Sequence, residues 1–236
     1  SSLRMMISSG AMFTTQVKRD LIEHIPELAI ADVLGSTEGG MGQSIMTKDT
    51  PASETAKFML LPTSKVLLPD SSREVTPGSG EVGMVAQSGM VPLGYYKDPK
   101  KSAGTFKEID GKRYAFPGDM ATVAADGSIN LLGRGSNCIN TGGEKVFPEE
   151  VEEALKLHDA VEDALVFGLD DERFGSRVAG VVSLEKTKSA AAEDIVSATR
   201  ALLASYKLPK ELIVVPKVPR APNGKADYKA AKQLLM

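Results

Sequence analysis

Residues 131–155 have the sequence LLGRGSNCINTGGEKVFPEEVEEAL, and the rest of the chain can be organised around this stretch. A short strand is expected to end at Gly133-Arg134, a flexible Gly-Ser-Asn segment follows, and Pro148 begins a carboxylate-rich helix. Proline suits the first helical position, and the glutamates after it favour the positive end of the helix dipole. The apolar residues of this helix fall on one face, which predicts packing against downstream elements. The stretch therefore predicts a link between two separately folded bodies.

The paired glycines Gly142-Gly143 lie inside this stretch. Paired glycines weaken a strand and mark either a bend or a close approach of a ligand to the backbone. Taken alone, they favour the bend.

Composition fits two bodies and excludes several classes of protein. The chain has 236 residues, of which 42% are hydrophobic, and this is enough for two cores. Its 28 basic and 31 acidic residues give no bias toward nucleic acid or an anionic membrane. Cys138 is the single cysteine, which excludes an internal disulfide and suits a reducing compartment. With no apolar run of about 20 residues and no signal peptide, we expect a cytoplasmic protein without a membrane span.

The spacing of apolar residues predicts an α/β part followed by an α+β part. A strand at 3–9, a helix at 14–24 and a strand at 28–34 form a parallel unit, whose ligands gather beyond the carboxyl ends of the strands. Residues 50–132 predict a small barrel-like or bent sheet with strands at 65–68, 83–87, 114–124 and 129–132 and a helix at 99–106. The last hundred or so residues predict helices from 148, at 191–204 and from 227, and strands at 161–168, 178–184 and 212–215.

Four short motifs occur along the chain: Leu34-Gly-Ser-Thr-Glu38, Pro117-Gly-Asp119, Gly133-Arg134 with the later Gly142-Gly-Glu144, and Pro222-Asn-Gly-Lys225. In this order and spacing they resemble the signatures of the adenylate-forming superfamily, the acyl-CoA synthetases and their relatives. Each motif alone is weak, but four in register are specific. The resemblance extends from the first third of the chain to its end.

The resemblance implies the C-terminal part of an AMP-forming acyl-CoA synthetase, or fatty-acid–CoA ligase. Residues 1–134 would be the end of the large AMP-binding domain, and residues 135–236 a small C-terminal lid domain. The parent enzyme would join a fatty or other lipid-like carboxylic acid to ATP, giving acyl-AMP and pyrophosphate, and would then transfer the acyl group to CoA. It would use Mg²⁺, with ATP and CoA as co-substrates.

The resemblance also assigns a set of residues to the nucleotide, namely Gly10, Ala11, Asp32, Leu34, Gly35, Ser36, Thr37, Asp119 and Arg134. Gly10 and Ala11 would lie against the adenine, and Asp32 would accept a hydrogen bond from its amine. Thr37 would contact phosphate, and Asp119 would accept from both ribose hydroxyls. Leu34 departs from the family, which usually has an aromatic residue there. Seen alone, these motifs favour ordinary turns.

Catalysis and CoA binding are assigned in the same way. Lys225 would be the adenylation lysine, and Glu38 would be catalytic through holding Mg²⁺. Ser136 would be the hinge, where relatives usually have Asp or Lys. The residues implied for CoA are Gly142, Gly143, Phe174, Tyr206, Lys207 and Lys210. Outside the motif context, Lys225 is a solvated turn lysine and Phe174 a half-buried packing residue, and some relatives carry arginine in place of Leu208.

Two other functions remain open. One is an adenylation enzyme that loads a carrier-protein thiol, although no carrier sequence follows Met236 and Phe174 favours CoA. The other is a non-catalytic binding module of the same fold, which would give Asp119 and Lys225 no reason to occur together. The chain starts at Ser1 and has no match to the family's Ser/Thr/Gly-rich phosphate loop. We therefore expect a fragment that lacks the upstream part of its large domain and is inactive alone.

Overall fold

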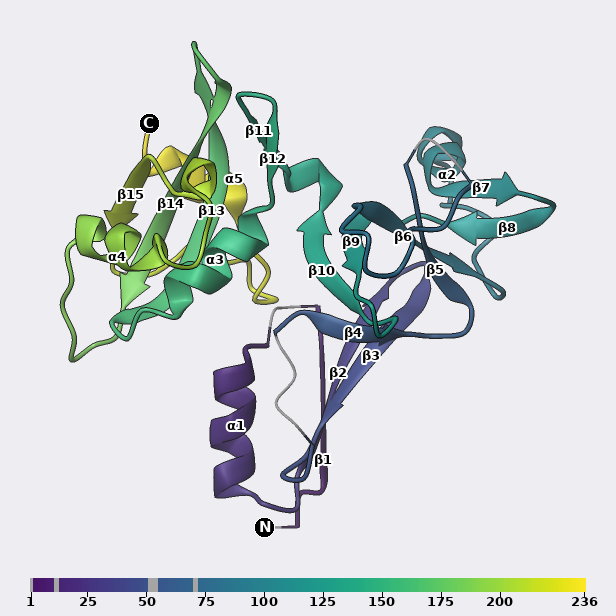
Figure 1. Ribbon diagram of the computed structural model, residues 1–236, viewed down its shortest axis with the longest axis horizontal. Helices are drawn as coiled ribbons and strands as arrows, with labels where there is room; N and C mark the ends of the chain where they lie inside the picture. The colour runs from purple at the N-terminus through teal and green to yellow at the C-terminus, as the bar shows by residue number, and fades with distance from the viewer. Residues whose placement is uncertain (1, 11–12, 51–54, 70–71) are drawn as a thin grey trace. The chain divides into compact units, whose positions relative to one another are not determined.

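The computed structural model describes residues 2–10, 13–50, 55–69 and 72–236 (Figure 1). The chain divides into two compact units, Ser1–Leu132 and Gly133–Met236. The division lies close to the one expected after residue 134. Each unit has its own hydrophobic core.

The first unit begins with the predicted strand, helix and strand. β1 (Met5–Ser9) pairs in parallel with β2 (Ala29–Ser36), and α1 (Thr15–His24) connects them. Thr14 caps the helix, because its side chain accepts a hydrogen bond from the backbone N–H of Val17 at 3.3 Å. Buried Ile22 from the helix packs with apolar residues of the sheet. The parallel unit is confirmed.

The rest of the first unit extends this sheet to ten strands, in the order β1-β2-β3-β4-β10-β9-β6-β8-β7, with β5 paired to β6. The added elements are β3 (Gly39–Met46), β4 (Lys57–Leu60), β5 (Ser64–Leu67), β6 (Gly83–Ser88), α2 (Pro99–Thr105), β7 (Phe106–Ile109), β8 (Lys112–Ala115), β9 (Asp119–Val123) and β10 (Ile129–Arg134). The mixed α/β class is confirmed. The expected barrel-like subdomain, however, is an open continuation of the same sheet within the described residues, because β4 pairs with both β3 and β10.

One strand prediction in this unit was wrong for a local reason, and one strand was missed. The strand expected at 114–124 is two strands, β8 and β9, because Pro117 has no N–H and Gly118 turns the chain with φ +100°. β3, which is rich in glycine, was not predicted. Gly42 belongs in this strand because a Cβ there would lie 2.9 Å from the carbonyl oxygen of Met59 on β4.

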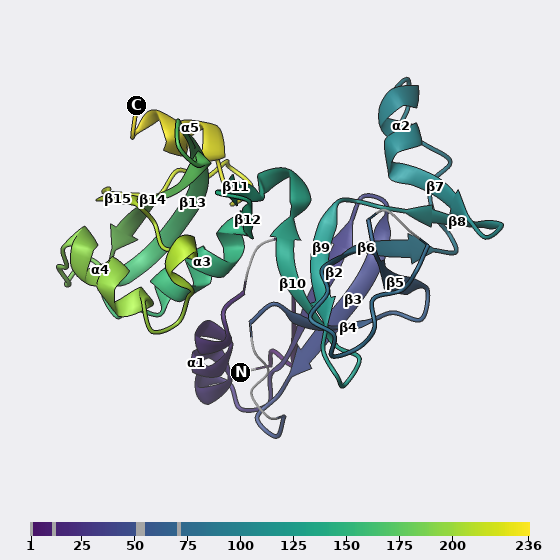
Figure 2. The same ribbon diagram turned by 45° about the horizontal axis from the view of Figure 1, so that its top comes forward.

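The second unit is a five-stranded sheet with helices on both faces (Figure 2). Its elements are η1 (Gly135–Asn137), β11 (Ile139–Thr141), β12 (Glu144–Val146), α3 (Pro148–Lys156), β13 (Val161–Asp171), β14 (Gly175–Leu184), α4 (Ala192–Thr199), η2 (Ser205–Lys207), β15 (Glu211–Val214) and α5 (Tyr228–Gln233). Buried residues of α3 and α4 pack on one face of the sheet, and α5 packs on the other. The predicted α+β organisation is confirmed.

The helix predicted at 191–204 is shorter than expected. It ends at Thr199, whose carbonyl accepts from the N–H groups of Leu202 and Leu203 at 3.0 and 3.3 Å and so forms a turn. The residues after this turn form a separate segment that leads into β15.

Candidate functional site

The predicted adenine and phosphate residues meet at one edge of the first sheet. Ser9 and Val33 are paired in register, so Gly10 follows β1 beside the end of β2. Gly10 is exposed with φ +80°, a conformation that suits glycine. Gly35 and Ser36 complete β2 at the same edge, as expected for the carboxyl ends of parallel strands. Ala11 lies outside the described residues.

Asp32 and Leu34 occupy buried positions on β2. Lys18 of α1 donates from Nζ to Asp32 Oδ2 at 2.8 Å, and both residues are nearly inaccessible. Leu34 packs in the core with Met41 and Phe58. Asp32 is therefore held by a cation of its own chain, and the predicted contacts of Asp32 and Leu34 with adenine stay predictions.

Glu38 is placed by a residue that sequence reasoning missed. It lies in the turn between β2 and β3, is buried, and accepts a hydrogen bond from the Tyr95 hydroxyl. The neighbouring Thr37 is exposed. Tyr95 lies 57 positions away, before α2, so no local pattern could have linked it to Glu38.

The chemistry of this turn suits Mg²⁺ carried by a nucleotide. Mg²⁺ is commonly held by one or two carboxylates together with substrate phosphates. Glu38 supplies a carboxylate with a fixed orientation, and Thr37 supplies an accessible oxygen. Within the described ranges, no group of three or more His, Cys, Asp or Glu side chains forms a dedicated metal site. The residues therefore fit a shared ion.

The predicted ribose residue, Asp119, is the buried first residue of β9. Gly118, just before it, turns the chain into the strand. Arg134 ends β10 and is exposed. Ser136 is exposed in the short helix η1 that follows.

In the second unit, the structure brings together three of the residues predicted to bind CoA. Gly142 and Gly143 form the turn between β11 and β12, with φ +60° and +90°. The N–H of Gly142 donates to the carbonyl of Phe174 at 2.9 Å, and a Cβ on Gly142 would lie 3.2 Å from the Phe174 ring. The Phe174 ring is 44% exposed at the β13–β14 turn. An exposed aromatic face thus lies beside bare backbone.

The turn that carries Phe174 is well ordered by its own hydrogen bonds. The Asp171 carboxylate accepts from the N–H groups of Arg173 and Phe174 at 3.0 and 2.9 Å. The Arg173 guanidinium lies 5.0 Å from the centre of the Phe174 ring, so a cation accompanies the aromatic surface.

The other residues predicted to bind CoA differ from one another. Lys207 donates to both oxygens of Glu150 at 2.6 and 2.7 Å, so its charge is already paired. Tyr206 is 38% exposed. Lys210 is exposed and lines a hollow of about 550 Å³, and its N–H donates to Val178 on β14 at 2.8 Å. Of the two lysines, Lys210 is therefore the one whose charge is better placed to meet an anionic ligand.

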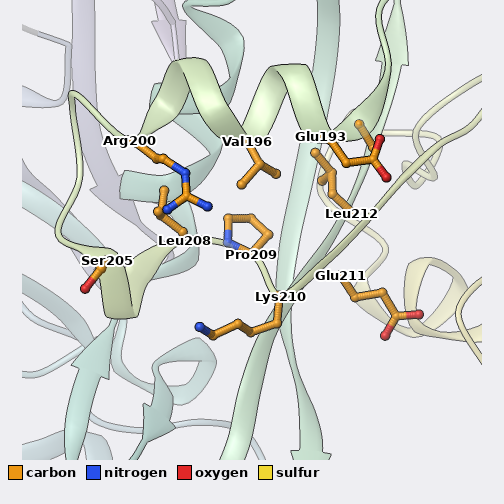
Figure 3. Close-up of a pocket in the computed structure, with 10 residues that line it drawn as sticks. Glu193, Val196, Arg200, Ser205, Leu208, Pro209, Lys210, Glu211 and Leu212 are labelled. Atoms are coloured by element: carbon orange, nitrogen blue, oxygen red, sulfur yellow. The ribbon is translucent and has the colours of Figure 1, made fainter.

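The hollow at Lys210 is polarised (Figure 3). Arg200 and Lys210 lie at one end, and Glu193 and Glu211 lie at the other. Apolar residues, among them the buried Leu208, line the space between. Sequence reasoning missed Arg200, although it lies only ten positions before Lys210 and is exposed. The two cations make one end of the hollow suitable for phosphate.

Lys225 occupies an exposed turn between β15 and α5. The Gly224 N–H donates to Ala221 at 2.8 Å, and the Lys225 N–H donates to the Asn223 side chain at 3.2 Å. Its ammonium therefore projects from an ordered turn.

A buried polar group lies beneath the segment that contains the predicted hinge. Glu152 of α3 accepts from the N–H of Val166 at 2.9 Å, and burial raises its pKa to about 7. Burial also raises the pKa of Tyr228, whose side chain makes a hydrogen bond with Asn137. The Glu149 carboxylate packs against the backbone of Gly133, because a Cβ on this glycine would lie 2.1 Å from it. The hinge segment is thus packed against α3 and α5.

Comparison with known proteins shows what the chain is similar to. Residues 150–225 match the family model described as the AMP-binding enzyme C-terminal domain. The chain is 46% identical over 235 residues to a 3-oxocholest-4-en-26-oate–CoA ligase of Rhodococcus rhodochrous, covering 98% of this chain and 42% of that protein. It is 45% identical to a medium/long-chain-fatty-acid–CoA/3-oxocholest-4-en-26-oate–CoA ligase of Mycobacterium tuberculosis, covering 99% of this chain and 42% of the relative. The chain thus spans less than half the length of these relatives.

A solved structure shows the same fold. The crystal structure of ATP-bound MatB from Rhodopseudomonas palustris superposes with a TM-score of 0.80 at 26% identity, covering 98% of this chain and 44% of that chain. In the part of the chain that the structure describes, no helix is long and apolar enough to cross a membrane.

Proposed function

We propose that this chain, which belongs to the adenylate-forming enzymes, is the C-terminal part of an acyl-CoA ligase. The observation that carries the proposal is the identity of 45 to 46% with proteins named CoA ligases over nearly the whole chain, in both units. The ligase would convert a carboxylic acid and ATP to acyl-AMP and pyrophosphate, and then transfer the acyl group to CoA.

The substrate class that we propose is a lipid-like carboxylic acid, either a medium- or long-chain fatty acid or a sterol side-chain acid. The names of the relatives support this class. We place the reaction in the cytoplasm, where an isolated thiol such as Cys138 stays reduced.

In the first half-reaction, an oxygen of the acid attacks the α-phosphate of ATP, and pyrophosphate leaves. Asp119 would hold the ribose hydroxyls, and the Lys225 ammonium would offset the negative charge that spreads over the α-phosphate. Glu38, oriented by Tyr95, would hold the Mg²⁺ that screens the phosphates.

In the second half-reaction, the CoA thiolate attacks the acyl carbonyl, and AMP leaves. Gly142 and Gly143 would leave backbone bare along the thiol path, and the Phe174 ring would stack on the CoA adenine. Lys210 and Arg200 would bind its phosphates at the cationic end of the hollow. We propose that rotation about Ser136 exchanges the two sets of residues, so that one lid serves both steps.

The test uses the full-length protein with hexanoate, palmitate, 3-oxocholest-4-en-26-oate and benzoate. We expect acid-dependent release of pyrophosphate with the lipid-like acids and mass-spectrometric detection of their CoA thioesters. The 236-residue chain alone should release none. Acyl-AMP that accumulates without CoA thioester would favour a carrier-loading enzyme, and absence of both products would favour a binding module.

A further inference from the structure

The turn that carries Lys225 is shaped by bonds within itself. The Ala221 N–H donates to the Lys225 carbonyl, and the Gly224 N–H donates to the Ala221 carbonyl, both at 2.8 Å. The Lys225 N–H is bound by the Asn223 side chain. These bonds fix the form of the turn, but they do not fix its place on the domain.

Val218 and Ala226, which flank the turn, pack against apolar residues of the sheet, and the Arg220 side chain adds a polar link within the turn itself. Arg220 donates from Nε and Nη2 to the two oxygens of Asp163, at 2.6 and 2.7 Å. Its remaining nitrogen, Nη1, donates to the Gly224 carbonyl at 3.3 Å. Because the Gly224 carbonyl belongs to the peptide bond that enters Lys225, the guanidinium holds the backbone directly beside the lysine.

The other end of this link is firmly anchored. Asp163 lies on β13 and is paired with Ser183 of β14, and the next residue, Ala164, is fully buried. The bidentate geometry restrains both the distance and the plane of the guanidinium. Asp163 also raises the pKa of Arg220, so the arginine stays charged.

We infer that Arg220, held by Asp163, is a positioning residue that sets where the Lys225 ammonium can reach. The Lys225 side chain is exposed, so the place of its backbone determines its reach. Arg220 directs its guanidinium to Asp163 and Gly224, and it acts through Lys225 and not on substrate. The inference rests on the proposed function, in which Lys225 serves the first half-reaction.

The kinetic test is a double-mutant cycle in the full-length enzyme with Arg220→Gln, Lys225→Ala and the pair. Arg220→Gln should slow acyl-AMP formation by about 10- to 100-fold, the scale of a small misplacement of a catalytic group. It should leave transfer to CoA from supplied acyl-AMP within about twofold, since Lys225 serves only the first step. In the Lys225→Ala background, Arg220→Gln should cause no further loss.

Arg177→Gln is the matched control. Arg177 also joins a carboxylate, Glu211 at 3.0 Å, to a backbone carbonyl, that of Asp170 at 2.8 Å, in the same unit. Arg177→Gln should leave acyl-AMP formation unchanged. Multiplicative losses in the double mutant, or equal losses in both half-reactions, would show that Arg220 only supports the fold and would overturn the inference.

Trypsin cleavage after Lys225 tests the same restraint without reference to activity. Release of the turn in Arg220→Gln or Asp163→Asn should speed cleavage of the Lys225–Ala226 bond several-fold, whereas Arg177→Gln should not. Unchanged cleavage would overturn the positioning role even if the enzyme is active. If cleavage is faster in Arg220→Gln although the wild-type enzyme forms no acyl-AMP, the restraint is supported and only the proposed function is refuted.

Discussion

Four predicted functional residues, two in each unit, are presented in opposite ways. In the first unit, Asp32 and Glu38 are buried and already engaged by Lys18 and Tyr95. In the second unit, Phe174 and Lys225 lie on exposed turns. The difference indicates that the first unit fixes the orientation of its carboxylates by packing, whereas the second fixes only the backbone beneath groups that stay free to meet a ligand.

Lys18 offers the most direct test of the buried groups in the first unit. Its Nζ and the Asp32 carboxylate have side-chain exposures of 4% and 8%, so Lys18→Met would leave a buried charge without its counterion. We expect a loss of about 3 to 5 kcal/mol in the free energy of unfolding, measured by urea denaturation of this chain. Adding Asp32→Leu should recover much of it, because the uncompensated charge is then removed. A loss below about 1 kcal/mol would show that water reaches Asp32.

On the exposed side of the contrast, Lys225→Ala should affect chemistry and not stability. In the full-length enzyme, acyl-AMP formation should slow by about a hundredfold or more, the scale of losing one preorganised electrostatic contact. Transfer to CoA from supplied acyl-AMP should be nearly normal. Single-turnover kinetics of each half-reaction measures both, and equal losses in the two would refute a role confined to the first step.

Gly142→Leu should slow transfer to CoA and leave acyl-AMP formation nearly normal, because the leucine side chain would enter the space beside Phe174. Gly127→Leu is the control for backbone strain. It also lies in a hairpin turn with positive φ, but a Cβ there meets nothing within 4 Å. Slower transfer to CoA in both variants would mean that strain alone is responsible.

The same contrast explains what the sequence could predict. The Pro148 helix start and the turns at Gly142 and Gly224 depend on local chemistry, and all of them lie where the sequence indicates. The exposed site residues belong to such turns and were found by short motifs. The partners of the buried residues, Lys18 for Asp32 and Tyr95 for Glu38, depend on tertiary packing.

Strand pairing shows the same limit. β3 has a glycine-rich pattern that favours a turn, and only its neighbours β2 and β4 make it a strand. The segment 114–124 is a different case, because Pro117 and Gly118 are a local signal for the break between β8 and β9. Non-local partners decide β3, and a single sequence does not display them.

Glu152 is a buried carboxyl in the second unit, and it offers a smaller, pH-dependent effect on the free energy of unfolding. This effect tests whether burial also controls a carboxyl in the unit whose other functional groups are exposed. Burial raises its pKa from 4.5 to about 7, and Glu149, Lys156, Arg220 and Tyr228 are the titratable groups around it. Because the folded state holds the Glu152 proton more tightly than the unfolded state does, protonation stabilises the fold. This contribution to the free energy of unfolding is complete below pH 4.5 and is lost as the pH rises through about 7. Glu152→Gln should therefore be about 3 kcal/mol more stable than wild type at pH 8, with little difference at pH 4.5.

Urea unfolding of this chain at pH 4.5, 6 and 8 measures that difference. The glutamine can still accept from the N–H of Val166, so the hydrogen bond is kept and only the charge is lost. A difference that does not change with pH would show that Glu152 has an ordinary pKa.

The smallest expected effect is at Phe174, the exposed aromatic face of the second unit. With 44% of the residue accessible, Phe174→Ala should leave the free energy of unfolding nearly unchanged. Stacking of a base on an aromatic ring is worth about 1 to 3 kcal/mol, and the lower end suits a ring open to solvent on one side. We therefore expect KM for CoA to rise about five- to tenfold in the full-length enzyme, while acyl-AMP formation is unaffected. Leu202→Ala is the matched control, since Leu202 is 53% exposed in the same unit and lies outside the predicted CoA residues. If Phe174→Ala lowered stability while KM for CoA stayed constant, the ring would be a packing residue, and the division between fixed and presented groups would not extend to this turn.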